Sequence, residues 1–202
     1  MRPPTRDEDR AIAKRFGEEY FDGPRTQGYG GYRYNPRFWM PVAEDLRDAY
    51  GITAGTKVLD IGCAKGFLLH DLRQAVPGVE VYGLDISAYG VQHSMDDVRP
   101  RLVQGMAERL PYPDAAFDVV LCVNTLHNLP VDLCKLAVRE IVRVTRPGGH
   151  SYIQVDSWLT EQQHQDFLNW QLTAQTFFDP EGWRRLFAEA GYGGDYYWTL
   201  TE

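Results

Sequence analysis

The sequence lacks several features that mark particular classes of protein. Only three of its 202 residues are cysteine, and their odd number and irregular spacing predict a reduced chain without a disulfide framework. No apolar run approaches the roughly 18 residues that a membrane helix needs, so we expect no membrane partner. Residues 1–8 contain no apolar signal core. Together these absences favour a cytoplasmic protein.

Positive charge is also scarce. Lys and Arg number 21 against 28 Asp and Glu, which gives a net charge of −7. The deficit is concentrated in residues 151–202, which hold two basic and eight acidic side chains. Because nucleic-acid binding requires a basic footprint, we expect no nucleic-acid partner. With 44% apolar and 24% charged residues, the composition is typical of a globular chain with one sizeable core.

Short apolar runs alternate with amphipathic stretches between residues 56 and 156. Strands are predicted at 57–61, 79–84, 101–103, 117–123 and 151–155, and helices at 67–75, 87–95 and 131–144. This alternation predicts an α/β fold with a doubly wound parallel sheet and helices on both faces. A last strand at 196–200 completes a Rossmann-like, mostly parallel sheet of six or seven strands.

The segments outside this alternation predict the domain organisation. We interpret residues 1–50 as an N-terminal lid, and residues 51–202 as the main domain with an inserted cap helix at about 157–178. The lid is predicted to contain a charged helix near 7–16, a Gly- and Tyr-rich loop over 20–34 and a second helix over about 36–50.

A glycine-containing turn after the strand at 57–61 indicates a ligand site. It follows an acid, Asp60, and contains Gly62 and Gly66, whose small size lets a ligand approach the backbone closely. Asp85 ends the next strand, nineteen residues after Gly66, where a carboxylate can accept both hydroxyls of a ribose. The pattern predicts a nucleoside-containing cofactor across the carboxyl ends of the strands.

The spacing and charge of the turn distinguish between two such cofactors. A dinucleotide site has the pattern G-x-G-x-x-G, whereas three residues separate Gly62 from Gly66 here. An acid such as Asp60 beside the turn would repel a pyrophosphate. The same acid suits a cationic group, such as the ammonium of a methionine moiety. S-adenosylmethionine (SAM) is therefore favoured over NAD.

The motifs together resemble those of class I SAM-dependent methyltransferases, within their large group of small-molecule methyltransferases. Six elements carry the resemblance in order, at residues 60–66, 85–87, 105–112, 117–120, 124–130 and 140–149. The resemblance implies a seven-stranded sheet and transfer of a methyl group from SAM to a nitrogen or oxygen of a small-molecule acceptor. The alternative is a protein that binds SAM without turnover, as a regulatory or partner protein.

The resemblance also implies a set of cofactor contacts. These residues are Asp60, Gly62, Cys63, Ala64, Gly66, Asp85, Ile86, Met106, Ala107 and Asn124. Two of them depart from the family pattern. Ala64 stands where many members have a third glycine, and Met106 stands where an Asp often meets the adenine amino group. We expect SAM to bind with weaker discrimination for adenine, Met106 packing on the purine.

His127 is the candidate catalytic residue. It follows the strand at 117–123, where the resembling enzymes place groups that face the substrate, and an imidazole there could deprotonate an amine or hydroxyl. The alternative is a loop histidine bonded to the backbone. No His, Cys, Asp or Glu cluster has the spacing of a metal site, so we expect no metal.

The lid contributes the predicted substrate contacts, which are Tyr29, Tyr32, Arg33 and Tyr34. Tyrosines could surround an amine or the sulfonium, and an arginine could bind a carboxylate. The alternative is an aromatic clasp that packs the N-terminus on the sheet. The acceptor is expected to enter between residues 20–40 and 157–178. The acidic C-terminal segment slightly favours an amine acceptor, and the sequence leaves monomer and homodimer open.

Overall fold

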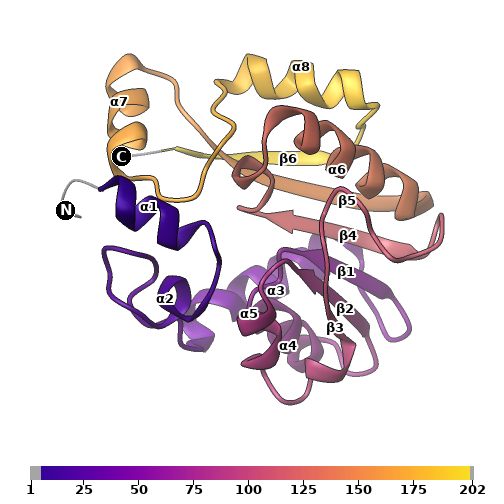
Figure 1. Ribbon diagram of the computed structural model, residues 1–202. Helices are drawn as coiled ribbons and strands as arrows, with labels where there is room; N and C mark the ends of the chain where they lie inside the picture. The colour runs from indigo at the N-terminus through magenta and orange to yellow at the C-terminus, as the bar shows by residue number, and fades with distance from the viewer. Residues whose placement is uncertain (1–5, 201–202) are drawn as a thin grey trace.

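Six parallel strands form one sheet in the order β3-β2-β1-β4-β5-β6 in the computed structural model, which describes residues 6–200 (Figure 1). The strands are β1 (Lys57–Ile61), β2 (Glu80–Asp85), β3 (Leu102–Gln104), β4 (Phe117–Val123), β5 (Thr145–Ser157) and β6 (Asp195–Leu200). The prediction of a doubly wound α/β sheet is confirmed. Within residues 6–200 the sheet has six strands, and the seventh that the resemblance implied is not among them.

The helices flank this sheet on both faces. They are α1 (Asp7–Ala13), α2 (Glu18–Phe21), α3 (Pro36–Tyr50), α4 (Phe67–Ala75), α5 (Ala88–Gln92), α6 (Val131–Val144), α7 (Glu161–Trp170) and α8 (Pro180–Ala190). Local chemistry sets several of their ends. The Asn35 side chain accepts a hydrogen bond from the Arg37 N–H at the start of α3, and Gly51 ends that helix in the left-handed region.

Two apolar cores lie on opposite faces of the sheet. In β4, Val120 and Cys122 pack with α6 and α8, whereas Val119 and Leu121 pack with α3 and α4. This two-residue period follows from the alternation of side chains along a strand that is buried on both faces. The two cores fix the strands against one another, and so they hold the carboxyl ends of β1, β2 and β4 in register.

The N-terminal segment crosses the carboxyl ends of the strands. Its first helix ends at Ala13, earlier than predicted, because Phe16 adopts a left-handed backbone with φ 50°. The hydroxyl of Ser87, at the start of α5, donates to the carbonyl oxygen of Phe16. Arg10 of α1 donates to the carbonyl oxygen of Leu168 in α7 at 3.0 Å, and the two helices stand side by side in Figure 1.

The longest departure from the predicted elements is in β5. The strand was predicted to start at residue 151, but it starts at Thr145 because Thr145 and His150 also pair with β4. The register shifts between Phe117 and Val119, so the pairing passes through an irregularity. None of the helices described between residues 6 and 200 is both long and apolar enough to cross a membrane.

Candidate functional site

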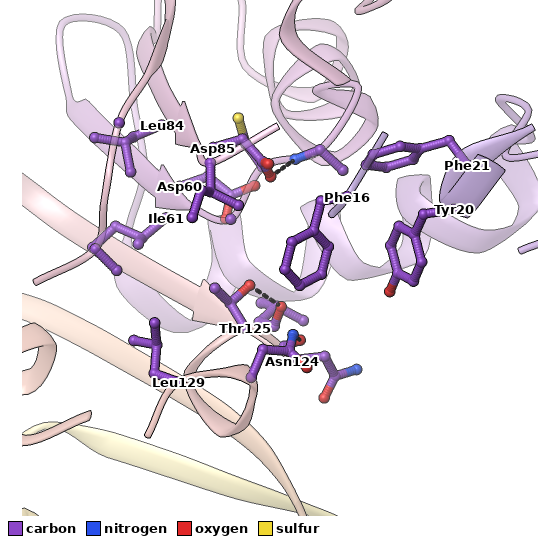
Figure 2. Close-up of a pocket in the computed structure, with 18 of the residues that line it drawn as sticks. Phe16, Tyr20, Phe21, Asp60, Ile61, Leu84, Asp85, Asn124, Thr125 and Leu129 are labelled. Atoms are coloured by element: carbon purple, nitrogen blue, oxygen red, sulfur yellow. Dashed lines mark hydrogen bonds between the residues drawn. The ribbon is translucent and has the colours of Figure 1, made fainter. Parts of the chain in front are cut away.

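A cavity of about 570 Å³ lies at the carboxyl ends of β1, β2 and β4. This is where the strand order reverses, between β1 and β4, and ligands of open α/β sheets bind at such a point. Figure 2 shows Asp60 and Asp85 on one side, Asn124 and Thr125 on the other, and the Phe16 ring between them. The cavity therefore joins the predicted cofactor turn, the loop after β4 and the N-terminal segment.

The turn after β1 forms part of the cavity wall. Gly62 has φ 82°, and a Cβ at this position would overlap the Thr125 side chain, so the loop after β4 can approach only a glycine. Ala64 also adopts a left-handed backbone, with φ 50°. Its N–H donates to Oδ2 of Asp85 at 2.7 Å, which stabilises this strained conformation. Gly62, Cys63 and Ala64 all line the cavity, so alanine at position 64 leaves it open.

Asp85 is held by backbone on both of its carboxylate oxygens. Oδ2 accepts from Ala64, and Oδ1 accepts from the Ser87 N–H at 2.8 Å. The residue is only 7% exposed, and burial raises the pKa of its carboxyl while the two N–H donors lower it. Each oxygen can accept a further hydrogen bond. The arrangement is suited to a ligand that presents two hydroxyl groups.

Asp60 is a buried acid at the cavity wall without an ion-pair partner among the described residues. It is 5% exposed, and burial together with the nearby charge of Asp85 raises its pKa to about 7. A carboxyl in this position is stabilised by a cationic ligand group, which would favour the ionised form. An acid in a cavity whose pKa is shifted by burial and by a second charge is a candidate for a functional site.

The segment after β3 contributes three residues to the cavity, Gly105, Ala107 and Glu108. Met106 does not line it and is 49% exposed. The Arg109 N–H donates to the Met106 carbonyl oxygen at 3.1 Å, and this tight turn directs Met106 outward. Met106 therefore does not face the cavity, where packing on a purine was expected, and the side chain of Glu108 lines the cavity instead. Ile86 lines the cavity as expected.

Asn124 and Gly66 were also predicted to contact the cofactor, but only Asn124 lines the cavity. Asn124 lines the cavity with φ 51°, and its Oδ1 accepts from the Thr199 hydroxyl at 3.2 Å. Gly66 does not line the cavity. It begins α4 with φ 70°, where a Cβ would lie 2.8 Å from a Val98 methyl group, so its glycine is explained by the turn and by packing.

His127 lies away from the cavity. It is 6% exposed, its Nδ1 accepts from the Asp156 N–H at 3.2 Å, and its Nε2 lies 3.5 Å from Oδ2 of Asp156. Burial lowers the pKa of the imidazole, against the opposing effect of Asp156. Its carbonyl oxygen accepts from the backbone of Gln175 and Thr176. His127 ties the loop after β4 to β5 and to the segment after α7, as the alternative of a loop histidine bonded to the backbone describes, and its role as a base stays a prediction.

The predicted lid residues divide into two pairs. Tyr29 and Tyr32 line the cavity with ring centroids 4.4 Å apart, and Tyr32 stacks on Phe67 at 4.8 Å. Burial is the main reason that the pKa of Tyr32 is raised. Arg33 is exposed and Tyr34 donates its hydroxyl to Asp71, and neither lines the cavity. Only the first pair can face a ligand there.

Several cavity residues lie outside the set predicted from the sequence. Among them are Lys14, Phe16, Tyr20, Phe21, Trp39, Glu108 and Gln175. The many aromatic residues of the N-terminal segment are the sequence feature that could have indicated part of this cavity wall. The inward position of Phe16 could not be predicted from the sequence, because it depends on a left-handed backbone and on the hydrogen bond from Ser87.

The comparisons with known proteins agree with this geometry. Residues 59–153 match the family described as methyltransferase domain, across the turn, both acids and the loop after β4. Over these residues the chain resembles the class I SAM-dependent methyltransferases. Its sheet resembles that of the YcgJ protein of Bacillus subtilis, with a TM-score of 0.59 and 23% identity over 74% of this chain and 68% of that one.

Two curated methyltransferases show where the sequence similarity lies. The 27-O-demethylrifamycin SV methyltransferase of Amycolatopsis mediterranei is 41% identical over 116 residues, which are 54% of this chain and 41% of that protein. The demethylmenaquinone methyltransferase of Anoxybacillus flavithermus is 36% identical over 52% of this chain and 47% of its own length. The chain spans less than half the length of these relatives.

Proposed function

We propose that the protein transfers a methyl group from SAM to a nitrogen or oxygen of a small-molecule acceptor. The observation that carries the proposal is the pair of buried acids at the strand switch point. Asp85 is fixed by two backbone N–H groups, and Asp60 has a pKa of about 7 and no cation beside it among the described residues. A ligand with a ribose at one end and an ammonium at the other satisfies both.

The residues of the cavity fit the parts of SAM in sequence. Asp85 would accept the ribose hydroxyls, and Asp60 would hold the ammonium of the methionine moiety directly or through water. The glycine at position 62 lets the cofactor approach the backbone. Ala107 lines the cavity, and its N–H would meet the adenine edge.

Methyl transfer needs little chemistry from the chain. When bound, SAM would supply a methyl group on a sulfonium, which an acceptor nitrogen or oxygen would attack in line; S-adenosylhomocysteine would leave with the electrons of the broken carbon–sulfur bond, and the acceptor's proton would pass to solvent. The rings of Tyr20, Tyr29 and Tyr32 contact one another along the cavity wall and would shield the reactants there. Alignment of two reactants in such a site can supply most of the acceleration. No proton transfer to His127 is part of the proposal.

The kind of acceptor follows from the cavity and from the relatives. The names of the two curated relatives specify small molecules, a demethylrifamycin and a demethylmenaquinone. Apolar side chains border the cavity beyond the cofactor turn, including Trp39, Leu129 and Leu133. They support a small, largely apolar acceptor.

Calorimetric titration with S-adenosylhomocysteine (SAH), the product of the cofactor, tests the proposal. We expect binding by the unchanged protein and a loss of about tenfold or more in Asp85→Ala, because hydrogen bonds to a buried charge are removed. Asp85→Asn, which keeps the shape, guards against misfolding, and Asp132→Ala is the control on the exposed start of α6. Absence of SAH binding, or equal binding by the Asp85 variants, would contradict the proposal.

Turnover separates catalysis from binding alone. A protein that binds SAH but forms none from SAM with any of a panel of amines, phenols and carboxylic acids would support the alternative of a SAM-binding partner protein. Detection of methylated acceptor by mass spectrometry would support the enzyme, and the product would identify nitrogen or oxygen as the acceptor atom.

A further inference from the structure

The methionine moiety of SAM carries a carboxylate as well as an ammonium, and the proposed function leaves the carboxylate without a partner. Asp60 and Asp85 are both acidic and cannot bind it. A carboxylate in a largely apolar cavity needs a cationic or strong hydrogen-bond donor close by. The following inference rests on the proposed function and concerns the side chain that supplies this partner.

Of three other cations in the adjoining segments, Arg25 and Lys65 are engaged elsewhere and Arg33 does not line the cavity. The guanidinium of Arg25 donates to the carbonyl oxygens of Gly28 and Tyr29, at 3.3 and 2.9 Å. Arg33 is exposed and does not line the cavity. Lys65 is buried with its Nζ 2.6 Å from Oδ2 of Asp22, so its charge is already paired.

Lys14 is the one Lys or Arg that lines the cavity among residues 6–200. It follows α1 directly, two residues before Phe16, and no acid among the described residues forms an ion pair with it. The Ser87 hydroxyl anchors the Phe16 carbonyl oxygen, which fixes this part of the chain over the cavity. Figure 2 shows the Phe16 ring between the two acids and Asn124, where the amino-acid end of SAM would lie.

We propose that Lys14 binds the carboxylate of the methionine moiety of SAM. Asp60 and Lys14 would then hold the two charges of the amino-acid end, the acid on the ammonium and the lysine on the carboxylate. The arrangement is complementary in sign at both positions. It also explains why a lysine without an acidic partner lies at the wall of a cavity that is otherwise rich in aromatic side chains.

A ligand that differs from SAH only in the carboxylate gives the sharpest test. S-adenosyl-3-thiopropylamine keeps the adenine, ribose, thioether and ammonium but lacks that group. In Lys14→Met we expect SAH to bind about three- to tenfold more weakly, since a partly exposed charged contact is lost, and the amine analogue to bind as before. Lys14→Arg should keep most of the affinity for SAH.

Arg15→Met is the matched control, because Arg15 is the adjacent exposed basic residue and does not line the cavity. Equal weakening of both ligands in Lys14→Met, or no weakening of SAH, would overturn the role of Lys14 and leave the proposed function standing. Failure of the unchanged protein to bind SAH would overturn the proposed function and this inference with it.

Discussion

The Nζ of Lys65 lies 2.6 Å from Oδ2 of Asp22, and this contact joins the cofactor turn to the N-terminal segment. The same ammonium donates to the Tyr32 carbonyl oxygen at 3.1 Å, and Oδ1 of Asp22 accepts from the Tyr32 N–H at 3.1 Å. The Tyr89 hydroxyl donates to Asp22 as well, at 2.8 Å. Because Lys65 is 7% exposed, the pair is more than a surface ion pair: loss of its acid would leave a buried charge.

Asp22→Asn is predicted to loosen the segment that covers the cavity. We expect faster hydrogen exchange of residues 16–34 and about three- to tenfold faster dissociation of SAH, because Tyr29 and Tyr32 would be held less firmly. Asp48→Asn is the control, since Asp48 pairs with Arg47 at 2.7 Å on the exposed surface of α3. Unchanged exchange over residues 16–34 in Asp22→Asn would rule out a role of this pair in holding the segment.

Asp60 is predicted to lower the stability of the ligand-free protein. Its pKa is raised to about 7 in the folded state. Between about pH 4 and 7 the carboxyl is therefore ionised in the unfolded chain but still protonated in the folded one. The free energy of unfolding contributed by this group therefore falls as the pH rises through that range. Asp60→Asn should increase the free energy of unfolding at pH 8 by roughly 1–3 kcal/mol and weaken SAH binding.

Urea denaturation at pH 5 and pH 8 measures this effect. Asp118→Asn is a control for which the change in the free energy of unfolding has the opposite sign. Burial alone would raise the pKa of Asp118, but hydrogen bonds from the Lys57 N–H and from Arg146 hold it below its usual range. Its removal should destabilise the protein at both pH 8 and pH 5, and the effect should diminish only as the pH falls below about 4. Destabilisation by Asp60→Asn at pH 8 would show that its charge is compensated in the ligand-free protein.

Glu108 is predicted to recognise the adenine amino group in place of an acid at position 106. Glu108 lines the cavity beside Ala107, whereas Met106 faces outward. We expect Glu108→Gln to weaken SAH binding about three- to tenfold and to reduce the preference for SAH over S-inosylhomocysteine, whose ring carries a carbonyl at that position. Met106→Ala should change the affinity for SAH by less than about twofold. Equal preference in Glu108→Gln and the unchanged protein would exclude this contact.

The fold and the cofactor end of the site were largely predictable from sequence. Apolar runs with helical stretches between them define the sheet, because strands buried on both faces must be continuously apolar. The positions of Asp60, Gly62 and Asp85 could be predicted because these residues lie at or directly after the ends of strands. Parallel strands bring those ends to one edge of the sheet.

The lid side could not be predicted in the same way. Arg33 and Tyr34 share a segment with Tyr29 and Tyr32, but a loop has no fixed period, so sequence spacing does not determine which side chains turn inward. The orientation of Met106 depends on a tight turn, and the position of Phe16 on a bond to Ser87. Such contacts are tertiary, and the local sequence does not specify them.

His127→Gln is predicted to affect stability and leave the cofactor site intact. The imidazole is buried and accepts a hydrogen bond from the Asp156 N–H, so its loss should lower the melting temperature by about 2–8 °C. SAH affinity should stay within about twofold, because the side chain does not line the cavity. His93→Gln, at the exposed end of α5, is the control with no expected effect on either quantity. A His127→Gln protein that keeps its melting temperature but loses turnover would instead support the imidazole as a base.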